Sequence, residues 1–381
     1  MNTLKTTVQV DEFTEYASKA FDFKFTGEST FTPHEVVGIP EKFAIGLIVG
    51  SSGSGKSTLL KTFGTEHTPL WDNNKAIVSH FTTPEEAVSR LSATGLNSIP
   101  TWMKPYHVLS TGEKFRADLA RSLNSNAIID EFTSVVNREV AISTSIAISK
   151  YITKNKLSNI VFSSCHKDIL PYLNPDWVYN TDTCELPIRR LLPRPEMELK
   201  IYRTTWKSWN MFKNHHYLSQ DLNKACRCFI GVLNGQVVAF NASISLPGRI
   251  PPLYEGDTRN KFRESRTVVL PDYQGMGIGT KFSNAIGEMF LDEGYRYFSK
   301  TAHPRMGEYR QNSLLWRPTA TNLKSREKAQ KRSKKEVWHR LALDTKRLCY
   351  SHEYLGSHSR YDGLIPSKAL EKFLKRVRTT G

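Results

Sequence analysis

Short apolar runs alternate with polar or glycine-rich segments along this chain, and their lengths predict an α/β protein. In the first half, residues 127–129 and 160–162 are apolar runs short enough for single buried strands. In the second half, residues 228–240 hold two apolar runs around Asn234-Gly235, the typical sequence of a tight β-hairpin turn.

The same pattern predicts four further elements in the second half. The runs 267–270 and 295–299 indicate strands on either side of residues 282–291, whose apolar spacing suits a helix. Upstream, residues 206–218 have the spacing of an amphipathic helix that ends in a His-His-Tyr sequence.

The first candidate binding site is the segment 50–58, Gly-Ser-Ser-Gly-Ser-Gly-Lys-Ser-Thr. A loop of this composition wraps nucleotide phosphates with successive backbone N–H groups, because glycine permits so close an approach. Lys56 would reach the β- and γ-phosphates, and the Ser57 hydroxyl would reach Mg²⁺. The residues predicted to bind the nucleotide are Gly50, Ser51, Ser52, Gly53, Ser54, Gly55, Lys56, Ser57 and Thr58.

Two later motifs extend this interpretation. Residues 109–113 are Leu-Ser-Thr-Gly-Glu, and Asp130-Glu131 directly follows an apolar run. In this order the three motifs resemble those of the ATP-binding-cassette (ABC) ATPases, whose signature is Leu-Ser-Gly-Gly-Glu. The resemblance implies an ATP-induced homodimer, in which Ser110 and Gly112 of one subunit close over the phosphate-binding loop of the other.

The resemblance also implies roles for the residues around the nucleotide. Asp130 would hold Mg²⁺ through water, together with Ser57, and Glu131 would polarise the attacking water. His166 follows the apolar run 160–162 in the segment Ile-Val-Phe-Ser-Ser-Cys-His, and it is similar to the switch histidine that contacts the γ-phosphate.

Some features differ from the ABC pattern. The glutamine that couples hydrolysis to a transporter subunit is missing, since no Gln occurs between residues 10 and 219. The segment from Lys56 to Ser110 is short, and Asn137 stands where the family usually has Asp. We therefore expect no transporter coupling, and a slow or switch-like hydrolysis.

A second glycine-rich segment, residues 274–279 (Gln-Gly-Met-Gly-Ile-Gly), lies between the predicted strand 267–270 and the predicted helix 282–291. A strand, loop and helix N-terminus in this order form an anion site, because free N–H groups and the positive end of the helix dipole face the ligand. The glycines do not match the dinucleotide fingerprint, and position 280 is Thr. A tight turn without a ligand is the alternative.

This segment resembles the Q/R-x-x-G-x-G/A motif of the GCN5-related N-acetyltransferase (GNAT) superfamily. The resemblance implies a GNAT-like mixed α/β domain whose loop amides grip the pyrophosphate of acetyl-CoA or another acyl-CoA-like donor. The donor-binding residues that it implies are Val269, Leu270, Gln274, Gly275, Met276, Gly277, Ile278, Gly279 and Thr280.

Several segments are similar to the DNA-modifying branch of this superfamily, typified by the Mom protein of phage Mu, which alkylates adenine with a carbamoylmethyl group. They are His216-Tyr217, the loop 268–275, and residues 301–304 and 315–317. This resemblance covers about residues 200–360 and implies a phage-type protein that modifies adenine in DNA. The group donor does not follow from it.

Catalytic residues of the transferase half stay open between two interpretations. His216 could accept a proton and Tyr217 could donate one to the departing thiolate, or the pair could only cap a helix and pack. His303 is a weaker candidate, and Cys226 or Cys228 as an acyl-carrying nucleophile is not favoured.

The length of 381 residues suits two domains. We expect an ABC-type ATPase domain with a parallel sheet at 1–185, a Pro/Arg-rich linker at 186–199, and a GNAT-like domain at 200–381 with a basic C-terminal extension. No apolar run approaches the roughly 20 residues that span a bilayer, and the N-terminus does not resemble a signal peptide. Five cysteines indicate reduced thiols. These features predict a cytoplasmic protein, in the host cytoplasm if phage-encoded.

Charge divides the chain into an acidic and a strongly basic half. Residues 1–185 hold 17 Lys/Arg against 20 Asp/Glu, a net charge of −3. Residues 186–381 hold 36 against 17, a net of +19, and the run 321–347 alone carries ten basic and three acidic residues. Such a field attracts polyanions, although a solvated basic helix or a flexible insertion is the alternative. We therefore predict nucleic-acid contact, DNA above all, and no membrane partner.

Three functions remain open from the sequence. The first is an ATP-regulated GNAT-type enzyme that modifies bases of DNA. The second is an acyl-CoA-dependent N-acetyltransferase acting on RNA, a protein or a small molecule. The third is a non-enzymatic ATP-dependent clamp on nucleic acid.

Overall fold

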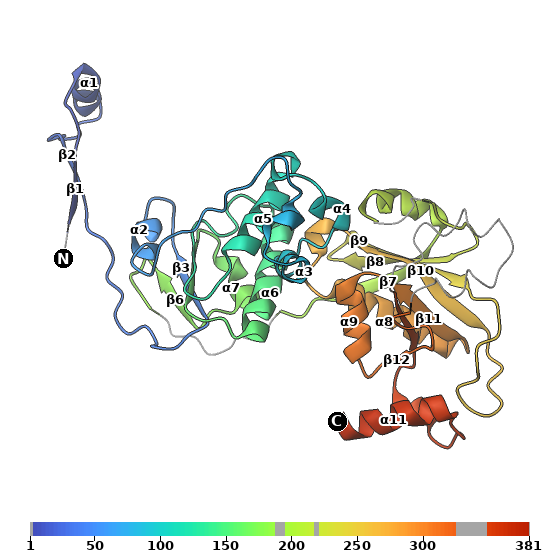
Figure 1. Ribbon diagram of the computed structural model, residues 1–381. Coiled ribbons are helices and arrows are strands. Elements are labelled where there is room, and N and C mark those ends of the chain that lie inside the picture. Colours follow the sequence, from blue (N-terminus) through green and yellow to red (C-terminus); the bar gives the residue numbers. More distant parts are fainter. Residues whose placement is uncertain (1–2, 187–194, 217–220, 325–348, 381) are drawn as a thin grey trace. The chain divides into compact units, whose positions relative to one another are not determined.

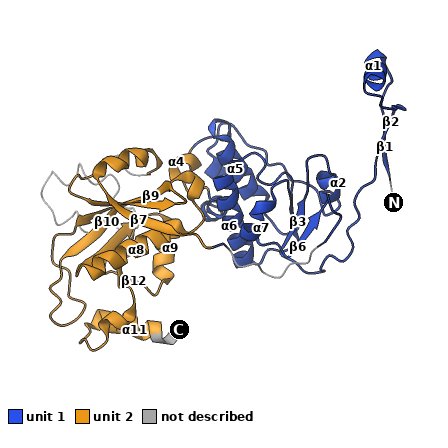
Figure 2. Ribbon diagram, turned by 180° about the vertical axis from the view of Figure 1, so that it is seen from behind, with its two compact units in different colours: residues 1–95, 104–195 blue, residues 96–103, 196–381 orange. Residues whose placement is uncertain are grey.

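The computed structural model describes residues 3–186, 195–216, 221–324 and 349–380, which form two compact units (Figures 1 and 2). Unit 1 comprises residues 1–95 and 104–195, and unit 2 comprises residues 96–103 and 196–381. The predicted linker at 186–199 falls largely on residues 187–194, which lie outside the described residues. A short segment between the phosphate-binding loop and the signature therefore belongs to unit 2.

Unit 1 is built on a four-stranded parallel sheet in the order β4-β5-β3-β6. Nearly all residues of these strands are buried, as in parallel sheets that are covered on both faces, which explains the uninterrupted apolar runs of the sequence. The strands are β3 (Ile45–Val49), β4 (Ile128–Ile129), β5 (Ile160–Ser164) and β6 (Trp177–Asn180).

The two faces of this sheet carry different cores, because successive side chains of a strand point to opposite faces. Leu47 and Val49 of β3 join the core that contains residues of α5, α6 and α7, whereas Ile48 joins a core with Leu59 and Leu60 of α2. The helices are α2 (Lys56–Leu60), α3 (Pro84–Ala93), α5 (Thr111–Ser122), α6 (Arg138–Asn155) and α7 (Leu170–Leu173), with 3-10 helices η1 (Ile77–His80), η2 (Tyr106–Val108) and η3 (Lys167–Ile169).

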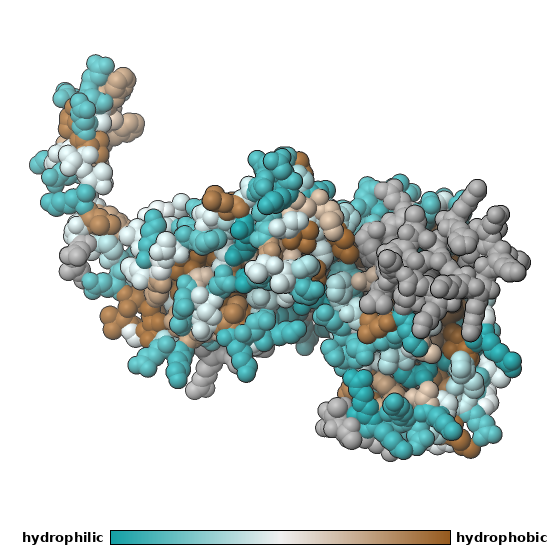
Figure 3. All heavy atoms as spheres, in the orientation of Figure 1, coloured by the Kyte–Doolittle hydropathy of each residue, from teal (hydrophilic) through white to brown (hydrophobic). Residues whose placement is uncertain are grey.

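The N-terminal segment contributes little to these cores. It contains the antiparallel pair β1 (Leu4–Thr7) and β2 (Glu28–Phe31) and the helix α1 (Glu12–Ala20). No residue of α1 is buried, and the aromatic side chains of Phe13 and Tyr16 are exposed. Figure 3 shows brown, hydrophobic residues on the surface of the N-terminal segment.

Unit 2 contains a seven-stranded mixed sheet in the order β12-β13-β11-β10-β9-β8-β7. The pair β10–β11 is parallel, and every other neighbouring pair of this sheet is antiparallel. The strands are β7 (Leu199–Thr204), β8 (Arg227–Leu233), β9 (Gln236–Ser245), β10 (Lys261–Val269), β11 (Arg296–Thr301), β12 (Trp316–Pro318) and β13 (Tyr350–Tyr354).

Helical elements pack on this sheet through aromatic side chains. Phe290 of α8 stacks on Tyr297 of β11 with 5.1 Å between ring centroids. On Phe240 of β9 pack Trp209, from a 3-10 helix, and Phe212, from the turn that directly follows that helix. The helical elements are α4 (Ile99–Trp102), η4 (Trp206–Met211), η5 (Lys213–His215), η6 (Pro271–Tyr273), α8 (Ile278–Asp292), α9 (Pro304–Asn312), η8 (His358–Tyr361) and α11 (Lys368–Thr380).

The structure confirms the predicted α/β class, the hairpin at Asn234-Gly235, and the helix and strands that surround the second glycine loop. The amphipathic helix predicted at 206–218 is wrong in type, because residues 206–211 and 213–215 form two separate 3-10 helices. The buried side chains Trp209 and Phe212 are three residues apart, which matches the three-residue turn of a 3-10 helix. Residues 217–220 lie outside the described residues.

Among the described residues, none of the helices has the length and apolar character that crossing a membrane requires.

Candidate functional site

The phosphate-binding loop of unit 1 joins the end of β3 to α2. Gly53 and Gly55 have φ angles of +77° and +85°, which glycine adopts without strain. A Cβ atom at Gly55 would lie 2.3 Å from the Phe31 ring, so this position also lacks space for any side chain. Lys56 Nζ lies 2.5 Å from the Ser51 carbonyl oxygen, which places the lysine across its own loop.

Two residues that the sequence reasoning missed hold this loop in place. The Asp182 carboxylate accepts hydrogen bonds from the backbone N–H and the hydroxyl of Ser51, at 2.9 and 2.8 Å. These bonds lower the pKa of Asp182 to about 2, with a smaller contribution from Lys167. The Ser54 hydroxyl lies 2.6 Å from Thr181 Oγ1. Both Thr181 and Asp182 directly follow the apolar run of β6, a position that could have indicated them.

The predicted metal ligands Ser57 and Asp130 lie together at the carboxyl end of the sheet. Asp130 accepts hydrogen bonds from the Ser163 and Ser57 hydroxyls and from the Glu131 N–H, the last at 2.9 Å. Burial opposes its charge, but these hydrogen bonds outweigh burial and hold the pKa of Asp130 below its usual value. A hydroxyl beside an ionised carboxylate is the oxygen-rich donor set that Mg²⁺ takes in nucleotide sites, where phosphates and water complete the shell. These residues therefore fit Mg²⁺.

Glu131 and His166 are placed by the turn that follows β4. Glu131 is exposed and has a left-handed φ of +46°, and its backbone N–H also donates to Ser163 Oγ at 3.1 Å. His166 follows β5, and its Nδ1 lies 3.1 Å from the hydroxyl of Thr133. The backbone of Thr133 also has a left-handed φ. The turn thus connects Asp130, Glu131 and His166 through short polar contacts.

The signature occupies the start of α5. Ser110 is exposed and caps this helix, forming a capping box with Glu113: the Glu113 carboxylate accepts from the Ser110 N–H at 3.0 Å. Gly112 lies in the first turn. Among the described residues, no hydrogen bond joins Ser110 or Gly112 to the phosphate-binding loop of the same chain. Asn137, the departure from the family pattern, caps α6 by accepting from the Val140 N–H at 2.9 Å.

In unit 2, the parallel strands β10 and β11 part before they end. Their pairing runs from Lys261 opposite Arg296 to Glu264 opposite Ser299. Beyond this point β10 continues to Val269 along β9, with a register shift between Glu264 and Arg266, and β11 continues to Thr301 along β13. Beyond Glu264 and Ser299, the facing edges of the two strands therefore do not pair with each other.

The second glycine loop follows β10 at this parting. Gly275 and Gly277 have φ angles of +86° and +91°, and Gly277 is the N-cap of the 15-residue helix α8. No acidic side chain occupies the first turn of α8, so its free N–H groups and dipole face no competing negative charge from the helix itself. The Thr280 hydroxyl donates to the Gly277 carbonyl at 2.9 Å. This cradle fits a pyrophosphate.

Val269, Leu270 and Gln274 connect the strand to the loop. Gln274 donates from Nε2 to the Val269 carbonyl at 2.9 Å and accepts at Oε1 from the Asn97 N–H at 3.0 Å. The Leu270 N–H donates to the Val238 carbonyl at 2.9 Å. The side chain of Gln274 is thus fixed at both ends.

Of the histidines considered, His303 lies at the parted strands. It lies two residues after β11, as the N-cap of α9, and its half-buried ring is hydrogen-bonded to the backbone of Asn97; within the described residues its buried Nδ1 atom has no hydrogen-bond partner. Burial lowers the pKa of His303. His216 lies at the end of η5, where its ring meets Trp209 edge-on at 5.6 Å, and Tyr217 lies outside the described residues.

The thiols of Cys226 and Cys228 are poor nucleophiles. Burial raises the pKa of both, in Cys228 to about 11, so neither is a thiolate at neutral pH.

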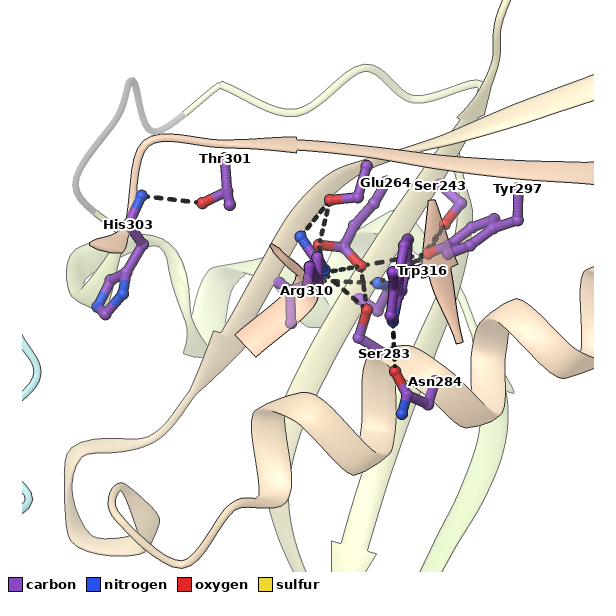
Figure 4. Close-up of polar contacts among 12 residues, drawn as sticks. Ser243, Glu264, Ser283, Asn284, Tyr297, Thr301, His303, Arg310 and Trp316 are labelled. Carbon is purple, nitrogen blue, oxygen red and sulfur yellow. Dashed lines mark hydrogen bonds and ion pairs between the residues drawn. The ribbon is translucent and has the colours of Figure 1, made fainter. Parts of the chain in front are cut away.

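A buried ion pair, Glu264 with Arg310, fixes the last paired residues of β10 and β11 (Figure 4). Arg310 of α9 donates to Glu264 at 2.9 Å and also to Ser283 and Ser299. Burial opposes the charge of Glu264, but Arg310 and the hydroxyls of Ser283 and Thr267 keep its pKa below the usual value. Glu264 is therefore a structural carboxylate, and the ring of His303 lies apart from this cluster in Figure 4.

Both parts of the chain are similar to solved structures, at TM-scores below 0.5. A dimeric post-hydrolysis state of the ATP-binding cassette MJ0796 bound to ADP and Pi is 14% identical over 41% of this chain and 89% of that chain, with a TM-score of 0.32. The ribosomal-protein-S18-alanine N-acetyltransferase from Escherichia coli is 11% identical over 42% and 96%, with a TM-score of 0.29. An acetyltransferase from Bacillus subtilis in complex with CoA is 10% identical over 42% and 99%, also at 0.29. No curated protein matches the chain.

Residues 195–309 match the model of the Acetyltransferase (GNAT) family. The matched range begins before β7 and ends in α9, so it contains the parted strands and the loop 274–279. Residues 195–309 therefore form a domain of the GNAT acetyltransferase type, and the N-terminal part of the chain contains a four-stranded parallel sheet.

Proposed function

We propose that this chain is an ATP-regulated, GNAT-type transferase that modifies nucleic acid, and that its substrate is the exocyclic amine of adenine in DNA. The observation that carries the transferase assignment is the parting of β10 and β11 directly before the glycine loop that opens α8. The DNA substrate is supported by the charge of the basic half and by the sequence resemblance to the Mom family.

The donor is held at the glycine loop. The N–H groups from Gly275 to Thr280 would bind the pyrophosphate of an acyl-CoA-like donor, and the free edges of β10 and β11 would hold the extended chain that follows it. Such a donor supplies an activated acyl group on a thioester. The acceptor amine forms the new N–C bond, the C–S bond breaks, and the departing thiolate takes up a proton.

His303 is the residue that we propose to take the proton from the amine. It lies where β11 leaves the ladder, its Nδ1 is unpartnered within the described residues, and its lowered pKa keeps it neutral at pH 7. His216 and Tyr217 remain the alternative pair from the sequence.

The acceptor must reach this site from a nucleic acid. Residues 186–381 carry a net charge of +19, which attracts phosphates. Most of the basic run 321–347 lies outside the described residues. A base inside a duplex is out of reach, so the enzyme has to flip it or act on a distorted strand. ATP-induced dimerisation of unit 1 would supply that distortion.

The test is mass spectrometry of nucleosides from DNA of cells that express the protein. The expected result is a new adduct on adenine whose mass names the transferred group. Gly277→Trp should abolish the adduct, because a side chain there fills the donor cradle. Gly294→Trp is the matched control: Gly294 follows the other end of α8, has a φ of +79°, and has open space around it.

Unchanged DNA beside soluble, folded protein would overturn the DNA assignment. In that case labelled acyl-CoA, incubated with RNA, protein and small-molecule fractions, identifies the acceptor. Failure to bind any acyl-CoA would instead favour a non-enzymatic clamp.

A further inference from the structure

Residues 96–103 belong to the acetyltransferase unit although their neighbours in sequence belong to unit 1. The segment is tightly packed: Leu96, Thr101 and Trp102 are at most 3% exposed. It is also closed on itself, since Trp102 Nε1 donates to the Leu96 carbonyl at 2.7 Å. Residues 96–103 are therefore an ordered, well-packed part of unit 2.

Asn97 in this segment contacts two elements of the candidate transferase site through its backbone. Its N–H donates to Oε1 of Gln274, the first residue of the donor loop, at 3.0 Å. Its backbone is also hydrogen-bonded to the ring of His303, at the end of β11. A single backbone position therefore positions both the donor loop and the proposed proton acceptor.

Both ends of the segment are anchored in unit 1. On one side the chain arrives from α3 through Gly95, whose φ is +83°. On the other side the Lys104 carbonyl accepts from the Ile77 N–H at 2.9 Å. The signature begins at Leu109, six positions after Met103. Any rearrangement of these flanks on nucleotide binding acts on residues 96–103 through the chain itself.

We propose that residues 96–103 are a positioning element of the donor site, through which nucleotide bound at residues 50–58 changes the affinity of Gln274 and its loop for acyl-CoA. The inference rests on the proposed function, because it takes the loop 274–279 as the donor site. By linkage, the donor must change the affinity for nucleotide by the same factor.

Because Asn97 makes these contacts through its backbone, two substitutions at this position distinguish a loss of the backbone N–H from a loss of the side chain. Asn97→Pro removes the N–H that binds Gln274, whereas Asn97→Ala keeps both backbone groups. The dissociation constant of acetyl-CoA for the full chain is measured by calorimetry, with and without Mg²⁺ and a non-hydrolysable ATP analogue. In the wild type the two constants should differ by about fivefold or more, the lower end of usual allosteric coupling.

In Asn97→Pro this ratio should fall to about one, while the nucleotide itself still binds; in Asn97→Ala it should keep the wild-type value. A wild-type ratio of one, or an unchanged ratio in Asn97→Pro, overturns the proposal. If Asn97→Pro does not fold, Gln274→Met removes the same hydrogen bond from the other side. The ratio of the two dissociation constants should then also fall to about one. Absence of acetyl-CoA binding in every state would instead be the failure of the proposed function.

Discussion

Asp130 and Glu131 are adjacent acidic residues that differ in how far their side chains are fixed by hydrogen bonds. Asp130 is fixed by hydrogen bonds from Ser163, Ser57 and the Glu131 N–H. Glu131 is exposed on a left-handed backbone, and it joins that network through its backbone N–H rather than its carboxylate. A fixed carboxylate suits metal binding and an accessible one suits a catalytic base.

Glu131→Gln should therefore retain ATP binding and lose hydrolysis. Removing a general base costs about 10²–10⁴-fold in rate. Steady-state phosphate release and the Kd of a fluorescent ATP analogue measure the two effects. Asp130→Asn is the comparison, because it should weaken Mg²⁺-dependent binding itself. Hydrolysis by Glu131→Gln at the wild-type rate would remove Glu131 from the catalytic role.

His303 and His216 differ in environment, and a pH profile separates them. Burial lowers the pKa of His303, so its neutral form persists below pH 6.5 and is lost only as the pH falls further. CoA release with DNA as acceptor should thus have a kcat/KM that is constant from pH 8 to 6.5 and declines below. His303→Gln should lower kcat by about 10²-fold or more and abolish this limb, whereas His216→Gln should not. The reverse pattern would assign the base to His216.

At the scale of elements, the site of unit 2 depends on one buried ion pair between β10 and α9. The Arg310 and Glu264 side chains are 1% and 8% exposed, so each is stabilised mainly by the other. Glu264 is the last residue of β10 that pairs with β11, so this ion pair lies where the two strands part.

Arg310→Met should destabilise unit 2 by about 3–5 kcal/mol, because it leaves the charge of Glu264 buried without a partner. Arg360→Met is the matched control: Arg360 bridges Glu288 and Asp292 but is 34% exposed, so its loss should cost about 0–1 kcal/mol. Hydrogen exchange of the β10 amides reports the free energy of opening. Equal effects of the two substitutions would contradict the structural role of the pair.

The sequence predicted the elements whose signal is local. Continuous apolar runs marked β5 and the hairpin β8–β9, and the glycines of the loop 274–279 marked the start of α8. The pair Glu264–Arg310 could not be predicted, because charged residues in a strand and a helix usually indicate exposed faces. Residues 96–103 carry no pattern that shows their membership of unit 2. Packing between distant segments decides such features.

At the scale of the whole molecule, the charge of the basic half predicts how the chain binds nucleic acid. Binding of a duplex oligonucleotide should weaken by about 10³–10⁵-fold between 50 and 200 mM salt if six to ten phosphates are contacted. Fluorescence anisotropy measures this. A peptide nucleic acid of the same sequence lacks phosphates and should bind weakly at every salt concentration. Salt-independent DNA binding would contradict phosphate contacts by the residues that carry the +19 charge.

The signature at the start of α5 is placed to take part in assembly. Ser110 is exposed at the start of α5 and, among the described residues, makes no hydrogen bond to its own phosphate-binding loop. If the signature closes over the loop of a second chain, Glu131→Gln with ATP and Mg²⁺ should sediment at twice the 43.4 kDa of one chain, and without ATP as a monomer.

Adding Ser110→Arg to the Glu131→Gln background should abolish that dimer, because a long cation replaces the small hydroxyl that would face the phosphates of the partner. Ser79→Arg, at an exposed serine of η1, is the control and should leave the dimer intact. ATP must remain bound in all three variants, which filter binding with labelled ATP verifies. A monomer that holds ATP in the Glu131→Gln variant would show that the nucleotide acts within one chain.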